Sequence, residues 1–260
     1  MIQKFILFAL VAVSCTTNPH SNRRQLTLIP QQRMFSLGKK SYEEMKKKET
    51  LLTSGRTFRQ VVSVGKNVAK ASGIQFPWEF AVIKNDKKIN AFCLPGGKIA
   101  VYTGILAVAE NEAGLAAILG HEIAHAVLRH GAERMSQALM TQLGLVVADI
   151  SLENTKYKRM LLAAMGLGAQ FGVLMPFSRS HESEADAIGL RYMAKAGYDP
   201  YEAPKLWQRM ASRGRKNGVP EMLSTHPDPN RRARDLARRI PSVLADYGKS
   251  QKKKSLKLIY

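Results

Sequence analysis

Three residues near the middle of the chain have the types and spacing for metal-dependent chemistry: His121, Glu122 and His125. On an α-helix, two residues four positions apart lie within about 40° of one another around the axis. The imidazoles of His121 and His125 would therefore leave the same face and share one metal ion. Two neutral imidazoles are typical ligands of Zn²⁺, and a neighbouring carboxylate can take a proton from the water that the metal activates.

The residues around this motif are almost all apolar, from Ala113 to Gly120 before it and from Ala126 to Leu128 after it. They predict a buried helix from about Glu112 to Gly131 or beyond. Buried histidines without partners are costly, and one metal ion satisfies two of them. The alternative interpretation is a pair of packed histidines that bind no metal.

Length and composition favour a globular protein with one domain or two closely joined domains. The chain has 260 residues, of which 45% are hydrophobic, and 40 Lys and Arg against 20 Asp and Glu give a formal charge of +20. Such a charge suits contact with nucleic acid, anionic lipid or acidic polymers. The basic residues are spread along the chain without interleaved aromatic residues, so we expect solvated faces and attraction to membranes, and no nucleic-acid partner.

The start of the chain has the pattern of a secretory signal. Lys4 precedes an apolar run from Phe5 to Val13 that is too short to span a bilayer. The sequence Ala12-Val13-Ser14-Cys15 resembles a lipobox, which predicts cleavage after residue 14 and a lipid on Cys15. Residues 15–30 then form a polar tether. The alternatives are an ordinary signal peptide cut elsewhere and an uncleaved anchor. Cys93 would have no internal partner and is interpreted as a small buried hydrophobe.

Hydrophobic patterning predicts an α+β fold that is mostly helical. Helices are expected over residues 31–48 and 57–71. Strand patterns over residues 79–83, 89–93 and 98–102 predict a small antiparallel sheet just before the metal helix. An edge strand of such a sheet could pair with an extended peptide and lay it across the metal. The alternative is a covering sheet with no catalytic role.

A zinc site needs a third protein ligand, and the acidic helix that follows Pro176 is its expected source. Glu182 and Asp186 lie four positions apart and share a face, so one can bind metal while the other orients a histidine. Spacing alone does not exclude His181 as a rival ligand, and Glu184 points elsewhere. His226 precedes Pro227 on a loop, where it could reach the site or be solvated.

Residues 132–175 are rich in Ala, Leu, Met and Gly, and they predict a helical hairpin. The charged residues within this stretch argue against two membrane spans. We expect a helical lid with some membrane contact, and a plain packed hairpin is the alternative.

Four motifs in this order resemble the zinc metallopeptidases of family forty-eight, a gluzincin family that includes Oma-type peptidases and periplasmic quality-control lipoproteins. The motifs are Asn90-Ala91-Phe92 with Pro95-Gly96-Gly97, His121-Glu122-x-x-His125, Ser178-Arg179-x-x-Glu182-x-x-Ala185-Asp186, and Ser224-Thr225-His226-Pro227. The resemblance covers residues 75–240 and is nearest to the lipoprotein branch.

This resemblance implies a role for each matching residue. One zinc ion per chain falls on His121, His125 and Glu182, with Glu122 as general base and Asp186 supporting the metal site. Arg179 and Arg232 match supporting residues, and Asn90 and Ala91 match substrate-binding positions. His226 matches a histidine that either fills the open metal position and holds the enzyme latent, or stabilises the oxyanion. His130 matches a histidine on the metal helix that is not a ligand.

Together these features predict a zinc endopeptidase with a metallopeptidase domain over residues 31–245 and a basic tail over 246–260. We expect it in the periplasm, anchored by lipid at the outer rather than the inner membrane, where it cleaves misfolded or unassembled envelope proteins. One alternative is a chaperone-like assembly factor whose zinc site is capped by His226 and the 132–175 hairpin, and which an envelope assembly or regulatory protein opens. Another is a basic envelope-binding protein with structural zinc, which would have a closed four-ligand site.

Overall fold

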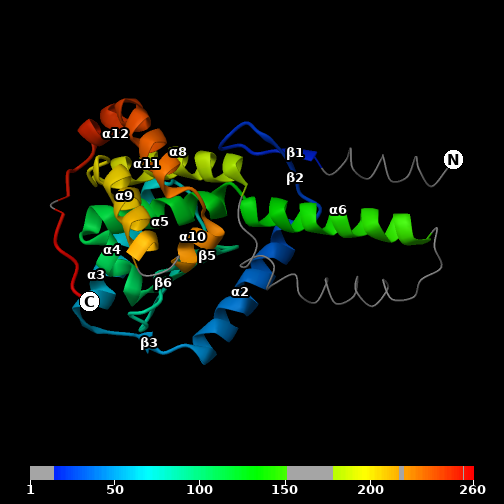
Figure 1. Ribbon diagram of the computed structural model, residues 1–260, viewed down its shortest axis with the longest axis horizontal. Helices are drawn as coiled ribbons and strands as arrows, with labels where there is room; N and C mark the ends of the chain where they lie inside the picture. The colour runs from blue at the N-terminus through cyan, green and yellow to red at the C-terminus, as the bar shows by residue number, and fades with distance from the viewer. Residues whose placement is uncertain (1–14, 151–177, 217–219, 254) are drawn as a thin grey trace.

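The computed structural model describes residues 15–150, 178–216, 220–253 and 255–260 (Figure 1). The predicted signal segment, residues 1–14, and the second half of the predicted hairpin, from residue 151, lie outside the described residues. Within the described part of the chain, no helix is both long enough and apolar enough to cross a membrane.

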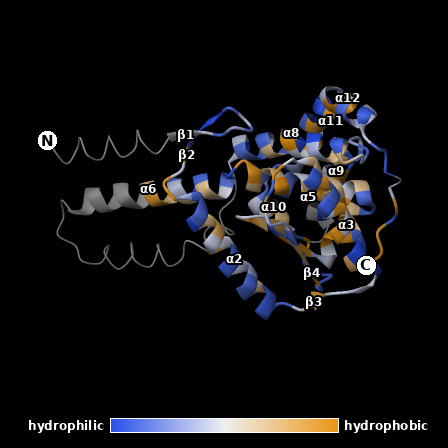
Figure 2. Ribbon diagram, turned by 180° about the vertical axis from the view of Figure 1, so that it is seen from behind, coloured by the Kyte–Doolittle hydropathy of each residue, from blue (hydrophilic) through white to orange (hydrophobic). Residues whose placement is uncertain are grey.

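Helix α5 (Glu112–Val127) is the centre of the fold and carries the predicted metal motif. The side chain of Asn111 caps the helix by accepting a hydrogen bond from the Gly114 amide at 2.9 Å. Nearly every residue of the helix is buried, and Figure 2 shows apolar residues gathered around it. It packs against α3 (Gly55–Ala71), α8 (Arg179–Lys195) and α9 (Glu202–Lys216).

Helices α5 and α8 cross with their backbones in close contact. A Cβ atom on Gly120 would lie 2.7 Å from the carbonyl oxygen of Gly189, and a Cβ atom on Gly189 would lie 2.7 Å from the carbonyl carbon of Gly120. Only residues without a side chain allow this approach. The crossing brings the histidines of α5 within reach of the carboxylates of α8.

The metal helix ends earlier than predicted. It stops at Val127, and Arg129 takes a left-handed conformation with φ of 58° before α6 (His130–Ile150) begins. The expectation of one helix to Gly131 is therefore wrong. The chain turns at Arg129 and then runs along α6, which projects away from the body of the molecule (Figure 1).

The predicted strands are present beside α5, and the α+β class is confirmed. The sheet has the order β3-β4-β6-β5, formed by Leu51–Leu52, Glu79–Ile83, Lys98–Tyr102 and Ala91–Leu94. Strands β4 and β6 are parallel, so the sheet is mixed rather than wholly antiparallel. The reason is that β5 folds back through a tight turn at Gly96 and Gly97, both with positive φ, which inserts β6 between β4 and β5.

The N-terminal residues form a hairpin against the end of α5. Strands β1 (Cys15–Thr17) and β2 (Arg24–Leu26) pair antiparallel, and α2 (Gln31–Lys48) follows. The buried side chains of Asn18 and Gln25 donate to the carbonyl of Leu128 at 3.0 and 2.6 Å. They satisfy a carbonyl that the end of the helix leaves without a helical partner. The predicted tether is thus docked on the body from residue 18.

The C-terminal region returns to the start of α5. The described helices are completed by α4 (Leu106–Ala109), α10 (Glu221–Thr225), α11 (Pro229–Arg239) and α12 (Leu244–Lys249). Two 3₁₀ turns join them, η1 (Thr103–Ile105) and η2 (Ile240–Val243). Beyond α12, the amide of Glu112 donates to the Leu256 carbonyl, and the amide of Leu258 donates to the Glu110 carbonyl, each at 3.0 Å. The predicted basic tail therefore packs beside the N-terminus of α5.

Candidate metal centre

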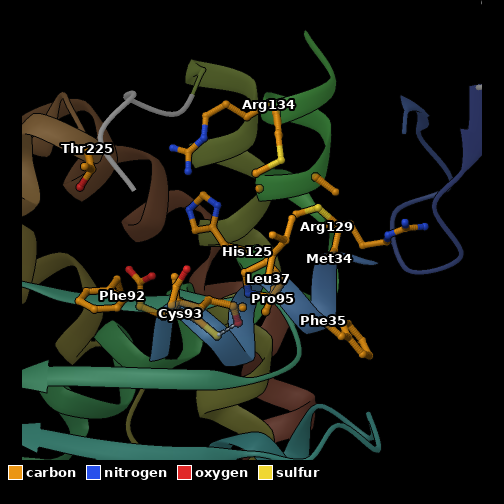
Figure 3. Close-up of a pocket in the computed structure, with 18 of the residues that line it drawn as sticks. Met34, Phe35, Leu37, Phe92, Cys93, Pro95, His125, Arg129, Arg134 and Thr225 are labelled. Atoms are coloured by element: carbon orange, nitrogen blue, oxygen red, sulfur yellow. Dashed lines mark hydrogen bonds between the residues drawn. The ribbon is translucent and has the colours of Figure 1, made fainter. Parts of the chain in front are cut away.

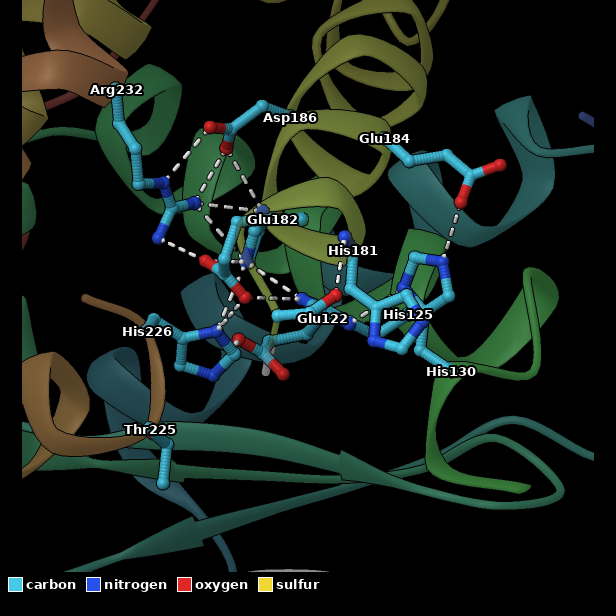
Figure 4. Close-up of polar contacts among 12 residues, drawn as sticks. Glu122, His125, His130, His181, Glu182, Glu184, Asp186, Thr225, His226 and Arg232 are labelled. Carbon is cyan, nitrogen blue, oxygen red and sulfur yellow. Dashed lines mark hydrogen bonds and ion pairs between the residues drawn. The ribbon is translucent and has the colours of Figure 1, made fainter. Parts of the chain in front are cut away.

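Four buried side chains converge where α5, α8 and the loop after α10 meet. His121 and His125 come from α5, Glu182 from the first turn of α8, and His226 from the loop. One donor atom of each lies within 4.8 Å of the donors of the other three. Figure 4 shows His125, Glu182 and His226 gathered at this point.

Four of the separations between these donors are close to those around a tetrahedral zinc ion. His121 Nε2 lies 3.0 Å from His125 Nε2 and 3.2 Å from His226 Nδ1. Glu182 Oε1 lies 3.0 Å from His226 Nδ1 and 3.3 Å from His125 Nε2. Ligands about 2.0–2.1 Å from a central zinc form a tetrahedron with edges of about 3.3 Å. The donors therefore fit zinc, and His226 stands at the fourth position.

Glu122 lies beside this cluster without being one of its donors. Its side chain is buried, and Oε1 is 3.5 Å from Nε2 of His226. This oxygen accepts no hydrogen bond from the described residues. A buried carboxylate oxygen without a donor is costly unless a ligand, a cation or water completes its surroundings. A carboxylate in this position could act as a base if the four donors held a metal ion.

His121 is oriented by a group that we call the inner support, which consists of Asp186 and Arg232. Oδ1 of Asp186 lies 3.0 Å from Nδ1 of His121, and Arg232 donates through Nε to Asp186 Oδ2 at 2.9 Å. Arg232 also pairs with Glu182 at 2.6 Å, and its guanidinium stacks 3.4 Å from the ring centre of Trp207. All of these side chains are buried.

The inner support keeps the carboxylates of the site ionised. Burial by itself raises the pKa of Glu182 and of Asp186, but Arg232 and the neighbouring His121 together outweigh it and lower both. Burial and Arg232 act to lower the pKa of His121, yet Glu182 and Asp186 raise it to about 9. The cluster thus favours a positive charge between its carboxylates. Burial lowers the pKa of His125, which keeps that imidazole neutral and able to bind metal.

His125 is approached from the other side by a group that we call the outer support, which consists of His130, Glu184 and Arg23. Nδ1 of His130 lies 3.0 Å from Nδ1 of His125, and its Nε2 lies 2.9 Å from Oε2 of Glu184 (Figure 4). Arg23 of the N-terminal hairpin donates through Nε to the same Glu184 oxygen at 3.0 Å. Burial lowers the pKa of His130 to about 4, so the ring is neutral.

A second histidine and carboxylate lie next to the outer support. His181 stacks on His130 with ring centres 4.3 Å apart, and its Nε2 lies 3.1 Å from Glu133. Arg23 donates to Glu133 through Nη1 at 2.8 Å. Burial by itself raises the pKa of Glu133, but Arg23 and His181 lower it to about 2. His181, the rival ligand, therefore faces Glu133 and not the metal donors.

The remaining predicted site residues are spread around the cluster. Asn90 is buried and donates to Glu221 at 3.1 Å. Ala91 is wholly buried in the edge strand β5, where it pairs with Val101, so only its backbone could meet a substrate. Arg179 is exposed at the first residue of α8, away from the buried donors.

A pocket of about 90 Å³ leads from the cluster between β5, α2 and α6 (Figure 3). Glu122, His125, His226 and Arg134 line its inner end. Its apolar wall includes Met34, Phe35, Phe92, Leu94 and Met135. Cys93 also lines the pocket and forms no disulfide within the described chain. A peptide laid along β5 would pass the cluster and place side chains in this pocket.

Several site residues were missed by the sequence reasoning. Trp207 was expected in the core, where it lies, but it also supports Arg232. Arg23 was assigned to a tether, and Glu133 was not considered. The spacing of His130 gave no useful signal, because in a continuous helix it would lie about 140° away from His125. The turn at Arg129 brings it back.

Comparison with known proteins agrees with this geometry. The model of peptidase family M48 matches residues 55–240. The chain belongs to peptidase family M48. Within the family, it is 37% identical over 232 residues to mitochondrial metalloendopeptidase OMA1 of Schizosaccharomyces pombe, which covers 86% of this chain and 66% of that protein. It is 35% identical over 179 residues to the beta-barrel assembly-enhancing protease of Yersinia pestis, covering 66% of this chain and 36% of that protein.

The chain thus spans less than two thirds of the length of these relatives. The sequence-based assignment to the metallopeptidases of family forty-eight, in the group of Oma-type and assembly-enhancing proteases, is confirmed. The family match includes all four donor residues, Glu122 and the inner support. Arg23 lies outside the matched residues.

Proposed function

We propose that this M48 metallopeptidase is a zinc-dependent endopeptidase of the bacterial cell envelope that cleaves misfolded or unassembled envelope proteins. The observation that carries the proposal is the buried cluster of four metal-binding side chains with the carboxylate of Glu122 beside it. The name of the beta-barrel assembly-enhancing protease supports an envelope role. Because other relatives are named as mitochondrial, the periplasmic location and the outer-membrane anchor depend on the predicted lipid at Cys15.

His121, His125 and Glu182 would hold the zinc ion, and His226 can add a fourth bond. The chemistry that a bound zinc supplies is Lewis acidity toward the scissile carbonyl and a lowered pKa for water. Asp186 accepts a hydrogen bond from Nδ1 of His121, which leaves Nε2 of that ring free for the metal. The inner support thereby sets the tautomer of one ligand.

Glu122 is proposed as the general base. Its carboxylate faces the cluster, so it can take a proton from the attacking water and pass it to the leaving amine. The substrate would pair with the free edge of β5, near Asn90, and place an apolar side chain in the pocket that Phe92 lines.

One observation favours a second candidate, an assembly factor whose protease site is latent. His226 supplies a fourth protein donor, where the sequence analysis assigned three zinc ligands through the family resemblance. A site closed by His226 would need an envelope partner to displace the loop after α10 before a substrate could enter. A purely structural zinc is less well supported, because the donor set has no cysteine and has Glu122 beside it.

The test combines zinc content with casein degradation for the full chain and for two variants, Glu122→Gln and His226→Ala. We expect one zinc per chain in all three proteins. Glu122→Gln should lower the rate by at least about a hundredfold, which is the low end for a general base, while it keeps zinc. Normal cleavage by this variant would refute the mechanism, and absence of zinc from the wild type would refute the metal site.

His226→Ala separates the two candidates. A working protease with His226 near the transition state should lose activity in this variant. A latent enzyme should be inactive as wild type and active as His226→Ala. Asn111→Ala, a change at the distant helix cap, is the control for a general loss of stability.

A further inference from the structure

The N-terminal hairpin reaches the metal centre through one side chain. Arg23 lies between two carboxylates from different helices, Glu133 of α6 and Glu184 of α8, and donates to both. Each carboxylate in turn contacts one ring of the stacked pair His130 and His181. The arginine thus closes a network that no single helix could form.

One arrangement of protons satisfies the contacts that run from Glu184 through His130 to His125. Glu184 accepts from Nε2 of His130, which leaves Nδ1 of that ring as an acceptor for Nδ1–H of His125. Nε2 of His125 then carries the lone pair that faces the metal cluster. In metal sites, an outer partner of this kind fixes the tautomer and orientation of the ligand.

We propose that Arg23 is a positioning residue for the metal ligand His125, which it acts on through Glu184 and His130. The N-terminal hairpin, residues 15–28, is therefore part of the metal centre and not only a connection to the predicted anchor. This inference rests on the proposed zinc site, and it extends that site to a segment outside the family match.

Arg23 is not the only side chain that holds the hairpin in place. Asn18 and Gln25 dock the hairpin independently on the carbonyl of Leu128. The side chain of Arg23 is 32% exposed, so its removal leaves no buried cavity. Without Arg23, the neighbouring carboxylates of Glu133 and Glu184 would lose the cation that they share. Their repulsion would then move Glu184 away from His130.

The sign of the effect on zinc affinity separates positioning from simple electrostatics. If Arg23 acted only as a nearby positive charge, its removal would tighten the binding of a cation. If it positions His125, its removal weakens zinc binding. Changes to outer partners of metal ligands typically cost about 10–100-fold in affinity, and we expect about 5–10-fold for this more distant residue.

The experiment measures zinc affinity by competition with a chelator for the full chain and for Arg23→Ala. Arg24→Ala is the matched control, because Arg24 is in the same hairpin, carries the same charge and is exposed. The visible spectrum of the cobalt-substituted protein reports the ligand geometry without any need for activity. We expect weaker zinc binding and an altered spectrum in Arg23→Ala, and wild-type behaviour in Arg24→Ala.

A double-mutant cycle tests the route. In a Glu184→Gln background, the further change Arg23→Ala should have little effect on zinc affinity, because the connection is already broken. Arg23→Lys, which keeps the charge but loses the fork of donors, should recover part of the affinity. The inference is overturned if Arg23→Ala binds zinc as tightly as wild type or more tightly, or if its effect adds fully to that of Glu184→Gln. No zinc in the wild type would instead defeat the proposed function.

Discussion

The two histidines of the metal helix are supported in different ways. His121 contacts a carboxylate directly, and the inner support is buried among α8, α9 and α11. His125 reaches its carboxylate through a second histidine, and the outer support ends at a partly exposed arginine on a hairpin. Both supports end in a carboxylate paired with an arginine, but in the outer support His130 stands between the ligand and the carboxylate.

This difference has consequences for stability. A charge pair that is fully buried depends on every partner, because removal of one leaves an uncompensated charge in a region of low dielectric. A pair that solvent can reach is screened and contributes less. The inner support should therefore govern folding as well as metal binding, whereas the outer support should mainly adjust the metal ligand.

Loss of Arg232 should have the largest effect on stability. Arg232→Met keeps the shape of the side chain over Trp207 but leaves Asp186 and Glu182 without their buried cation. We expect the zinc-free protein to lose about 3–5 kcal/mol of unfolding free energy in urea. Arg238→Met, at an arginine whose side chain is 74% exposed, should cost less than about 1 kcal/mol. Equal losses in the two variants would contradict the contrast between the two environments.

The crossing of α5 and α8 should matter next. Gly189→Ala places a Cβ 2.7 Å from the backbone of Gly120 and of His121, so the helices must separate. We expect a loss of about 1–3 kcal/mol in unfolding free energy, with weaker zinc binding because the donors of the two helices move apart. Gly131→Ala is the control, since a Cβ at Gly131 meets no atom within 4 Å. Undiminished zinc binding by Gly189→Ala would show that the crossing does not set the donor spacing.

The histidine pair and the carboxylates of α8 could largely be predicted from spacing, whereas Arg232 was assigned only through the family resemblance. The spacing of His121 and His125 places them on one face of a helix, and the spacing of Glu182 and Asp186 does the same on the next acidic helix. The periodicity of apolar residues likewise located α2, α3 and all three predicted strands. These features depend on local geometry, which short sequence patterns carry.

The outer support could not be predicted, because it depends on a turn and on distant contacts. Nothing in the residue types around Arg129 indicates that this arginine takes a left-handed conformation and redirects His130. The partners Arg23 and Glu184 are 161 positions apart in the sequence. The parallel pairing of β4 with β6 was missed for a similar reason, since strand order is set by packing and not by alternation.

Glu133, which lies next to the outer support and shares Arg23 with it, should respond to acid. The pKa of Glu133 is about 2 in the folded protein, because Arg23 and His181 outweigh the effect of burial, against an ordinary value of 4.5. A carboxylate with a lowered pKa stabilises the folded state fully above its unfolded pKa, and this contribution is lost as the pH falls toward the folded value. The relevant window is therefore pH 4.5 down to about 2.

Glu133→Gln removes this titration while it keeps the size of the side chain. We expect the variant to be less stable than wild type by about 1 kcal/mol at pH 6, since its arginine partner is partly exposed. The difference should fall to about half or less by pH 3, as the unfolded wild-type chain takes up the proton. Urea unfolding at several pH values measures it, with Glu44→Gln at a half-exposed helical pair as control. A difference that stays constant from pH 6 to pH 3 would mean that Glu133 contributes by shape and not by charge, and the two supports would then differ in chemistry and not only in burial.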